Sequence, residues 1–337
     1  MNESKKCRLL YIDAAKGLSM LSIILGHLGI IGINKFVFTY HVPIFLIISG
    51  MFFVPKDGMI KKRFIGCIKP YLATSIIMLG FSVGRAFLKY ILNREDFDGV
   101  LNCAADRFLS ILYGSGSRHD FFGFEFEIIG AIWFLLALMW ATIILWIILR
   151  KINNNIIQGT IVILAFAFAY LSAKYTWMPL SIQSGLSALL FVYVGYLTKN
   201  DKLKPIFMRN RKIIVLLCIA MWGLAIFFSY YNSNMSLVRS YFPNILINVI
   251  GACCASYLII TFLSFLDRIV IVADSKAYKL LCYFGKNSLI LLCFHLIEFN
   301  YVPWHYNLQD SGSGSFSINY NNYRKTCMGH FLDLYDK

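Results

Sequence analysis

The feature that most constrains this chain is a series of long apolar stretches that recurs almost from end to end. GLSMLSIILGHLGIIG, residues 17 to 32, belongs to the first of them. A helix of about 20 apolar residues crosses roughly 30 Å of hydrocarbon and satisfies its backbone hydrogen bonds internally. Because 58% of the residues are hydrophobic, 15% are charged and the mean hydropathy is +0.65, the sequence predicts an all-α integral membrane protein.

Window hydropathy predicts a polytopic bundle of about nine transmembrane helices. Residues 1–300 form the predicted transmembrane domain, and residues 301–337 form a polar C-terminal tail that is expected to be disordered. Residues 89–127 are too polar to cross the bilayer and are expected to form a long external loop. The distribution of Lys and Arg favours a cytoplasmic N-terminus. The helices are expected at residues 10–32, 37–54, 66–88, 128–149, 156–173, 182–198, 213–230, 243–265 and 282–300.

The net charge of +15 does not indicate a nucleic-acid partner, because no basic face is joined to a recognition fold. In a membrane protein such an excess marks cytoplasmic loops and anionic headgroups, so membrane lipid is the expected partner. The nine cysteines show no CxxC spacing, and Cys253 and Cys254 lie inside an apolar run. No metal site is expected, and the oligomeric state is left open.

The first predicted helix carries a polar stripe. An ionisable residue inside the membrane is costly, which favours a functional role or a buried partner. Lys16 and His27 lie within about 20° of each other around the helix axis, and Asp13 stands where it can pair with Lys16. An imidazole can take a proton from a hydroxyl at neutral pH, so His27 is a candidate general base. Two alternatives stay open: a structural clasp between Asp13 and Lys16, and a histidine that only joins helices.

Two further helices carry candidate histidines. His41 lies about 7 Å below the outer edge of the bilayer, at a depth similar to that of His27. In the last predicted helix, His295 and Glu298 stand at i, i+3 in the outer half. Either histidine could serve the same chemistry or only pack between helices.

The inner half of the bilayer carries candidate binding residues. Ser49 with Gly50 could contact a ligand, although small residues also serve helix packing. The run KKRFIGCIKPY, residues 61 to 71, places Lys62 and Arg63 at the membrane surface, where a phosphorylated donor could dock. The alternative is that these are ordinary cytoplasmic charges.

Five sequence blocks together resemble the acyltransferase 3 family of membrane O-acyltransferases, in the branch that modifies polysaccharides and sugars. The resemblance covers most of residues 8 to 300, and the first two blocks are its specific part. The blocks are RLLYIDAAKGLSMLSIILGH, FTYHVPIFLIISGMFF, KKRFIGCIKPY, AIWFLLALMW and FGKNSLILLCFHLIE.

The resemblance implies about ten helices and an acyl group, usually acetyl from acetyl-CoA, that is transferred to a hydroxyl of an extracytoplasmic glycan. It implies that His27 is the essential histidine and that His41 and Arg63 occupy family positions. Where many members have arginine, this chain has Lys16, which keeps the charge without the bidentate geometry. The resemblance also implies a location in a bacterial cytoplasmic membrane.

The sequence thus predicts an acyltransferase with His27, Asp13 and His41 as catalytic residues. Lys16, Ser49, Lys62 and Arg63 are its predicted contacts to acetyl-CoA. Two other classes stay open. A transporter or channel would use the same polar stripe as a substrate path, and an inactive membrane scaffold would bind no donor.

Overall fold

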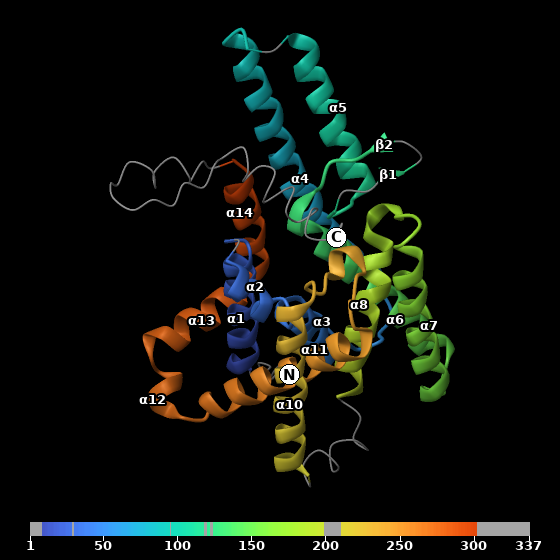
Figure 1. The fold of residues 1–337 in the computed structure, drawn as a ribbon, viewed down its shortest axis with the longest axis vertical. Helices are drawn as coiled ribbons and strands as arrows, with labels where there is room; N and C mark the ends of the chain where they lie inside the picture. The colour runs from blue at the N-terminus through green and yellow to red at the C-terminus, as the bar shows by residue number, and fades with distance from the viewer. Residues whose placement is uncertain are drawn as a thin grey trace, which may run out of the picture.

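The predicted all-α class is confirmed by the structure, a computed structural model that describes residues 9–28, 30–94, 96–117, 120–121, 124–198 and 210–301 (Figure 1). Within these ranges the only strands are the two-residue β1 (Asp120–Phe121) and β2 (Phe124–Glu125), which pair antiparallel. The predicted tail from 302 lies outside the described residues.

The helices are α1 (Leu10–Gly26), α2 (Ile31–Val37), α3 (His41–Met51), α4 (Met59–Ile91), α5 (Phe97–Tyr113), α6 (Trp133–Lys151), α7 (Asn155–Ser172), α8 (Ile182–Leu197), α10 (Arg211–Tyr231), α11 (Ile245–Leu266), α12 (Val270–Ala273), α13 (Lys276–Lys286) and α14 (Ser288–Tyr301), with short 3-10 turns η1 (Gly130–Ile132), η2 (Pro179–Ser181) and η3 (Leu237–Arg239).

Most of the predicted membrane helices are long enough to span a bilayer. Seven segments of the described chain are long and apolar enough, and the bent pair α13–α14 makes an eighth. Helix α1 is shorter, with 17 residues. The protein is therefore a polytopic integral membrane bundle. The seven segments are Ile31–Met51, Met59–Ile91, Gly130–Lys151, Asn155–Ser172, Pro179–Leu197, Arg211–Tyr231 and Ile245–Leu266.

Two predicted helices are broken. The helix expected at 37–54 begins earlier and is split into α2 and α3 by the turn at residues 38–40. The ring of Pro43 would clash with the carbonyl of Thr39 in a continuous helix, so α3 has to start anew. The helix expected at 282–300 is bent by 80° at the break between α13 and α14. Hydropathy averages over such breaks and does not register them.

The predicted external loop at 89–127 is wrong for much of its length. Helix α4 is longer than expected, and its 33 residues measure about 50 Å, more than the roughly 30 Å of a hydrocarbon core. Helix α5 then packs beside α4, and both project away from the bundle (Figure 1). Gly114 ends α5 in the left-handed conformation.

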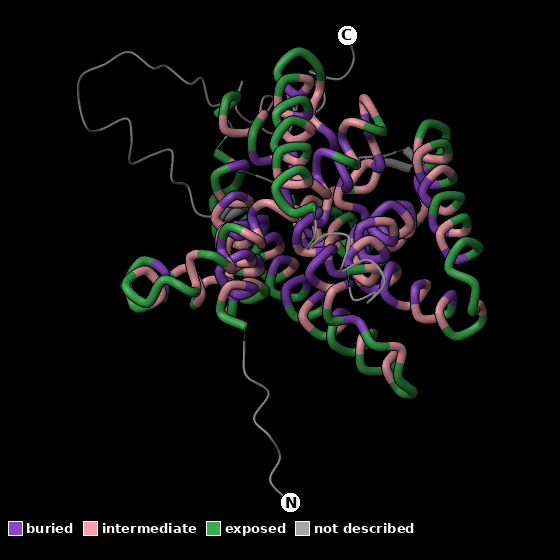
Figure 2. Tube along the Cα trace, turned by 90° about the horizontal axis from the view of Figure 1, so that it is seen from below, coloured by how far each residue is buried: buried purple, intermediate pink, exposed green. Residues whose placement is uncertain are grey.

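Helix α8 lies at the centre of the bundle, between α3, α6 and α7. Its contact with α3 is backbone to backbone, because a Cβ on Gly195 would overlap the carbonyl of Ile47, and one on Gly50 would overlap that of Val192. Small residues permit such close approach in membrane helices, where there is little hydrophobic drive. Buried residues accordingly gather at the middle of the bundle and exposed ones at its periphery (Figure 2).

A second close contact joins α1 to α13, which lie side by side (Figure 1). A Cβ on Gly17 would overlap the carbonyl of Leu281, and one on Gly285 would overlap the carbonyl of Asp13. This contact fixes α1 against the segment that leads into α14. Two regions far apart in the sequence are thereby held together beside the histidines.

Candidate active site

One cavity of about 1950 Å³ runs through the bundle between α1, α3, α4, α6 and α14 and the link from α10 to α11. Its lining changes in character along its length. A cluster of cations lines the end near the start of α4, and apolar side chains line the middle. The other end is lined by histidines and polar loop residues, together with Lys35 and Arg239.

The cationic end carries four positive side chains and one acid. Lys16 comes from α1, and Lys62 and Arg63 come from the first turns of α4, with Lys56 just before them. The acid, Asp57, is paired with Arg150 at the end of α6. This end of the cavity is therefore strongly positive, as a phosphorylated ligand requires.

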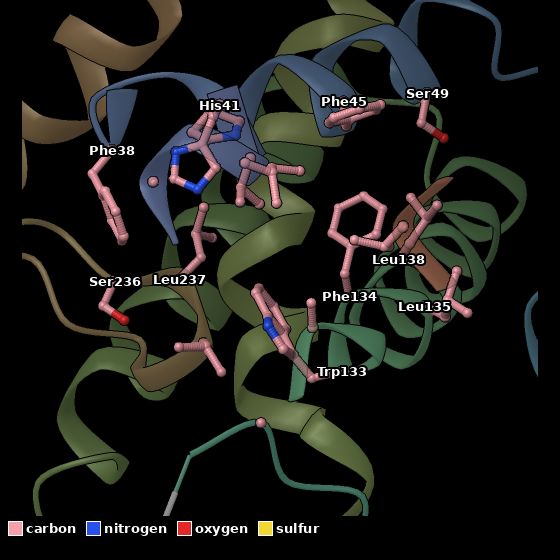
Figure 3. Close-up of a pocket in the computed structure, with 18 of the residues that line it drawn as sticks. Phe38, His41, Phe45, Ser49, Trp133, Phe134, Leu135, Leu138, Ser236 and Leu237 are labelled. Carbon is pink, nitrogen blue, oxygen red and sulfur yellow. The ribbon is translucent and has the colours of Figure 1, made fainter. Parts of the chain in front are cut away.

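The middle of the cavity is apolar. Phe45 of α3 and Phe134 of α6 line it in edge-to-face contact, with ring centroids 5.9 Å apart, and Leu135 and Leu138 extend the wall (Figure 3). Ser49 is the polar exception, and its Oγ is buried without a hydrogen-bond partner among the described residues. A buried hydroxyl without a partner is costly, so this oxygen is a candidate ligand contact.

The other end holds a chain of three titratable groups. The Nδ1 of His27 lies 3.1 Å from the Nε2 of His295, and the Nδ1 of His295 lies 3.6 Å from Oε2 of Glu298. His27 is the residue that follows the last turn of α1, while the other two stand on α14. A helix C-terminus carries partial negative charge, and His27 stands at that end of α1.

His41 lines the same end of the cavity from the first turn of α3 (Figure 3). Its Nδ1 donates to the carbonyl oxygen of Val37 at 2.7 Å. A carbonyl only accepts, so the proton of a neutral His41 ring is on Nδ1 and its Nε2 is unprotonated.

The segment before α6 closes one side of this end, where Gly116 and Gly130 line the cavity. The segment is held by Arg107, whose side chain bonds the carbonyl of Ile128 at 3.1 Å and pairs with Glu127 at 3.1 Å. Beside it, burial raises the pKa of the Tyr113 hydroxyl, which donates to a backbone carbonyl.

The structure brings six of the seven predicted site residues onto this cavity and leaves one out. Asp13 is buried beside α13 and does not line the cavity, so any role it has is exerted through its neighbours. Within the described residues, no cluster of His, Cys, Asp or Glu is suited to a metal ion. The six are Lys16, His27, His41, Ser49, Lys62 and Arg63.

Sequence reasoning did not assign His295 and Glu298 to a shared site with His27. Their i, i+3 spacing was visible, but their approach to His27 depends on the bend before α14. It also did not single out the link from α10 to α11, whose residues carry no motif.

Fold and site together define a polytopic membrane protein with an internal cavity that joins a cationic end to a histidine cluster. The family model described as "Acyltransferase domain" (Acyl_transf_3) matches residues 9–312. The chain therefore belongs to the acyltransferase 3 family, and it is a membrane acyltransferase. No curated protein matched the chain. No solved structure matched it either.

Proposed function

We propose that this protein transfers an acetyl group from acetyl-CoA to a hydroxyl of an extracytoplasmic glycan, in a bacterial cytoplasmic membrane. The observation that carries the proposal is that the residues of the cationic end and His27 line one and the same cavity. A coenzyme has a polyphosphate end and a thioester end on a long, flexible arm. The cationic end of the cavity suits the polyphosphate, and the end that holds His27 suits the thioester. The apolar middle suits the arm between them.

The histidine chain supports a protonation state in which His27 is the base. In this state the ring proton of His295 is on Nδ1, which faces the carboxylate of Glu298 at 3.6 Å, and its Nε2 accepts from His27. The proton of neutral His27 is then on Nδ1, which leaves its Nε2 unprotonated. An unprotonated ring nitrogen is what a general base requires.

In the proposed reaction, Nε2 of His27 takes the proton of the acceptor hydroxyl as its oxygen attacks the thioester carbonyl. The tetrahedral intermediate collapses with cleavage of the carbon–sulfur bond, and the leaving thiolate takes the proton back from His27. An ester and free coenzyme A result. The imidazolium that forms in between is favoured by the carboxylate of Glu298, beyond His295, and by the partial negative charge at the C-terminal end of α1.

The experiment that tests the proposal measures coenzyme A release by the purified full chain in nanodiscs, with acetyl-CoA and a glycan acceptor. Release that depends on the acceptor, together with a mass gain of one acetyl group on the glycan, is the expected result. Solute uptake in proteoliposomes without release of coenzyme A would indicate a transporter instead. Failure to bind acetyl-CoA would indicate a scaffold.

The cationic end gives a matched pair of variants. Lys62→Ala with Arg63→Ala is expected to raise the KM for acetyl-CoA by about tenfold or more, because charge-assisted phosphate contacts are lost. Lys61→Ala removes an exposed neighbouring charge that does not line the cavity, so it is expected to change the KM less than twofold. Equal effects of the two changes would mean that Lys62 and Arg63 act only through overall charge.

Glu298 gives a test of the histidine chain. Glu298→Gln removes the negative charge that favours the imidazolium, so kcat is expected to fall about tenfold while the KM for acetyl-CoA stays constant. Asp274→Asn is the control, because Asp274 is paired with Lys279 outside the cavity. Steady-state kinetics of both variants check this, and an unchanged kcat for Glu298→Gln contradicts the proposed role.

A further inference from the structure

The link between α10 and α11 forms most of one wall at the histidine end of the cavity. Residues from Tyr230 to Pro243 contribute to the lining with few exceptions, and Figure 3 shows Ser236 and Leu237 of this link across the cavity from His41. Trp133, at the start of α6, completes this outer compartment, which we define by Trp133 and residues 230–243.

The wall is held rigidly. Lys35 of α2 donates to the carbonyl of Asn232 at 2.6 Å, and Ser184 of α8 donates to the carbonyl of Val238 at 3.1 Å. Within the link, the backbones of Ser236 and Tyr241 exchange two hydrogen bonds at 2.8 and 2.9 Å. A surface that is already ordered loses little conformational entropy when a ligand binds.

The same compartment presents polar groups whose bonding capacity the protein leaves unused. Among the described residues, no hydrogen bond is made by Oγ of Ser236, by Oδ1 of Asn232 or by the indole Nε1 of Trp133, although Asn232 donates through Nδ2. Ser236 and Trp133 extend toward the cavity in Figure 3. Tyr230 and Tyr231 add aromatic faces at its rim.

This chemistry differs from both other parts of the cavity. The cationic end suits phosphate, and the apolar middle suits an alkyl arm. The hydroxyl of Ser236, the amide oxygen of Asn232 and the indole N–H of Trp133 lie in a compartment that also has aromatic faces and the guanidinium of Arg239. Such a mixture of donors, acceptors and ring faces suits a ligand that has many hydroxyls and apolar ring faces, which describes a sugar ring.

We propose that the outer compartment is the acceptor site and that it binds a sugar ring, with Ser236, Asn232 and Trp133 hydrogen-bonded to its hydroxyls. This proposal rests on the proposed function, because a bound ring would bring a hydroxyl to the end of the cavity that holds His27. It assigns the donor and the acceptor to opposite ends of one cavity.

The test measures sugar binding without catalysis. Saturation-transfer NMR is recorded on the full chain in nanodiscs with free glucose, galactose, rhamnose and chitobiose, in the absence of acetyl-CoA. At least one sugar is expected to give a signal, and Trp133→Phe combined with Ser236→Ala is expected to weaken it at least fivefold. Trp140→Phe is the matched control, because Trp140 stands on the same helix, does not line the cavity and donates to the carbonyl of Leu180.

Equal signals from the double variant and the wild type, or no signal from any sugar with the wild type, overturn the acceptor site. A parallel titration with acetyl-CoA separates this outcome from failure of the proposed function, because the variants leave the cationic end intact. Intact donor binding with no sugar binding refutes only the acceptor site. Loss of donor binding in the double variant would mean that the substitutions disturb the whole cavity.

Discussion

Replacing His27 with alanine is expected to lower acetyl transfer by about 10²–10⁴-fold, the range that general acid–base catalysis contributes. The physical reason is that the variant removes the proposed general base, the imidazole that stands at the end of α1 beside His295. Coenzyme A release and glycan acetylation, measured at saturating donor, check the prediction.

The control for this variant is donor binding. Lys16, Lys62 and Arg63 line the far part of the cavity and are untouched, so the Kd for acetyl-CoA is expected to change less than threefold. His295→Ala is expected to give an intermediate loss, because it removes the group that fixes the ring of His27 but leaves the base itself. Full activity of correctly inserted His27→Ala protein would refute the mechanism.

Replacing Gly285 with alanine is expected to destabilise the folded protein strongly. A Cβ at this position would overlap the carbonyl of Asp13, and backbone cannot move aside as the end of a flexible side chain can. Overpacking in a tight interface costs about 1–3 kcal/mol and more when backbone is displaced. The thermal midpoint of the purified protein in detergent is therefore expected to fall by several degrees, with a matching loss of monodisperse protein.

Gly223→Ala is the matched control. Gly223 lies inside α10, and a Cβ there meets no atom within 4 Å. Alanine in a helix interior is favoured over glycine by roughly 0.5–1 kcal/mol, so this variant is expected to be as stable as the parent or slightly more stable. If the two variants behaved alike, the close contact between α1 and α13 would not support the fold.

The histidine chain shows why part of the site could be predicted and part could not. His27 stands out in an apolar run, and the cost of burying a polar ring makes it a candidate from the sequence alone. Its partner His295 is 268 positions away, and no spacing rule connects them. Their approach depends on the bend of 80° before α14 and on the glycine contact between α1 and α13.

Asp13 shows what helical spacing leaves open. Helical spacing placed it near the stripe of Lys16 and His27, and a pattern on one helix does not tell which neighbour covers each face. In the structure α13 covers Asp13, while Lys16 and His27 line the cavity. A difference of about 40° around an axis is enough to separate two such environments.

The sequence by itself determined that this protein is an α-helical membrane protein, that its first helix carries a cation and an imidazole, and that its motifs resemble a known acyltransferase family. Those properties follow from local chemistry, since hydropathy, charge and short motifs are read over a few helical turns. Only the tertiary structure decided which residues share the cavity, because the broken helices and the glycine contacts depend on packing between distant segments. The pairing of His27 with His295 and the outer compartment of the α10–α11 link belong to this second group.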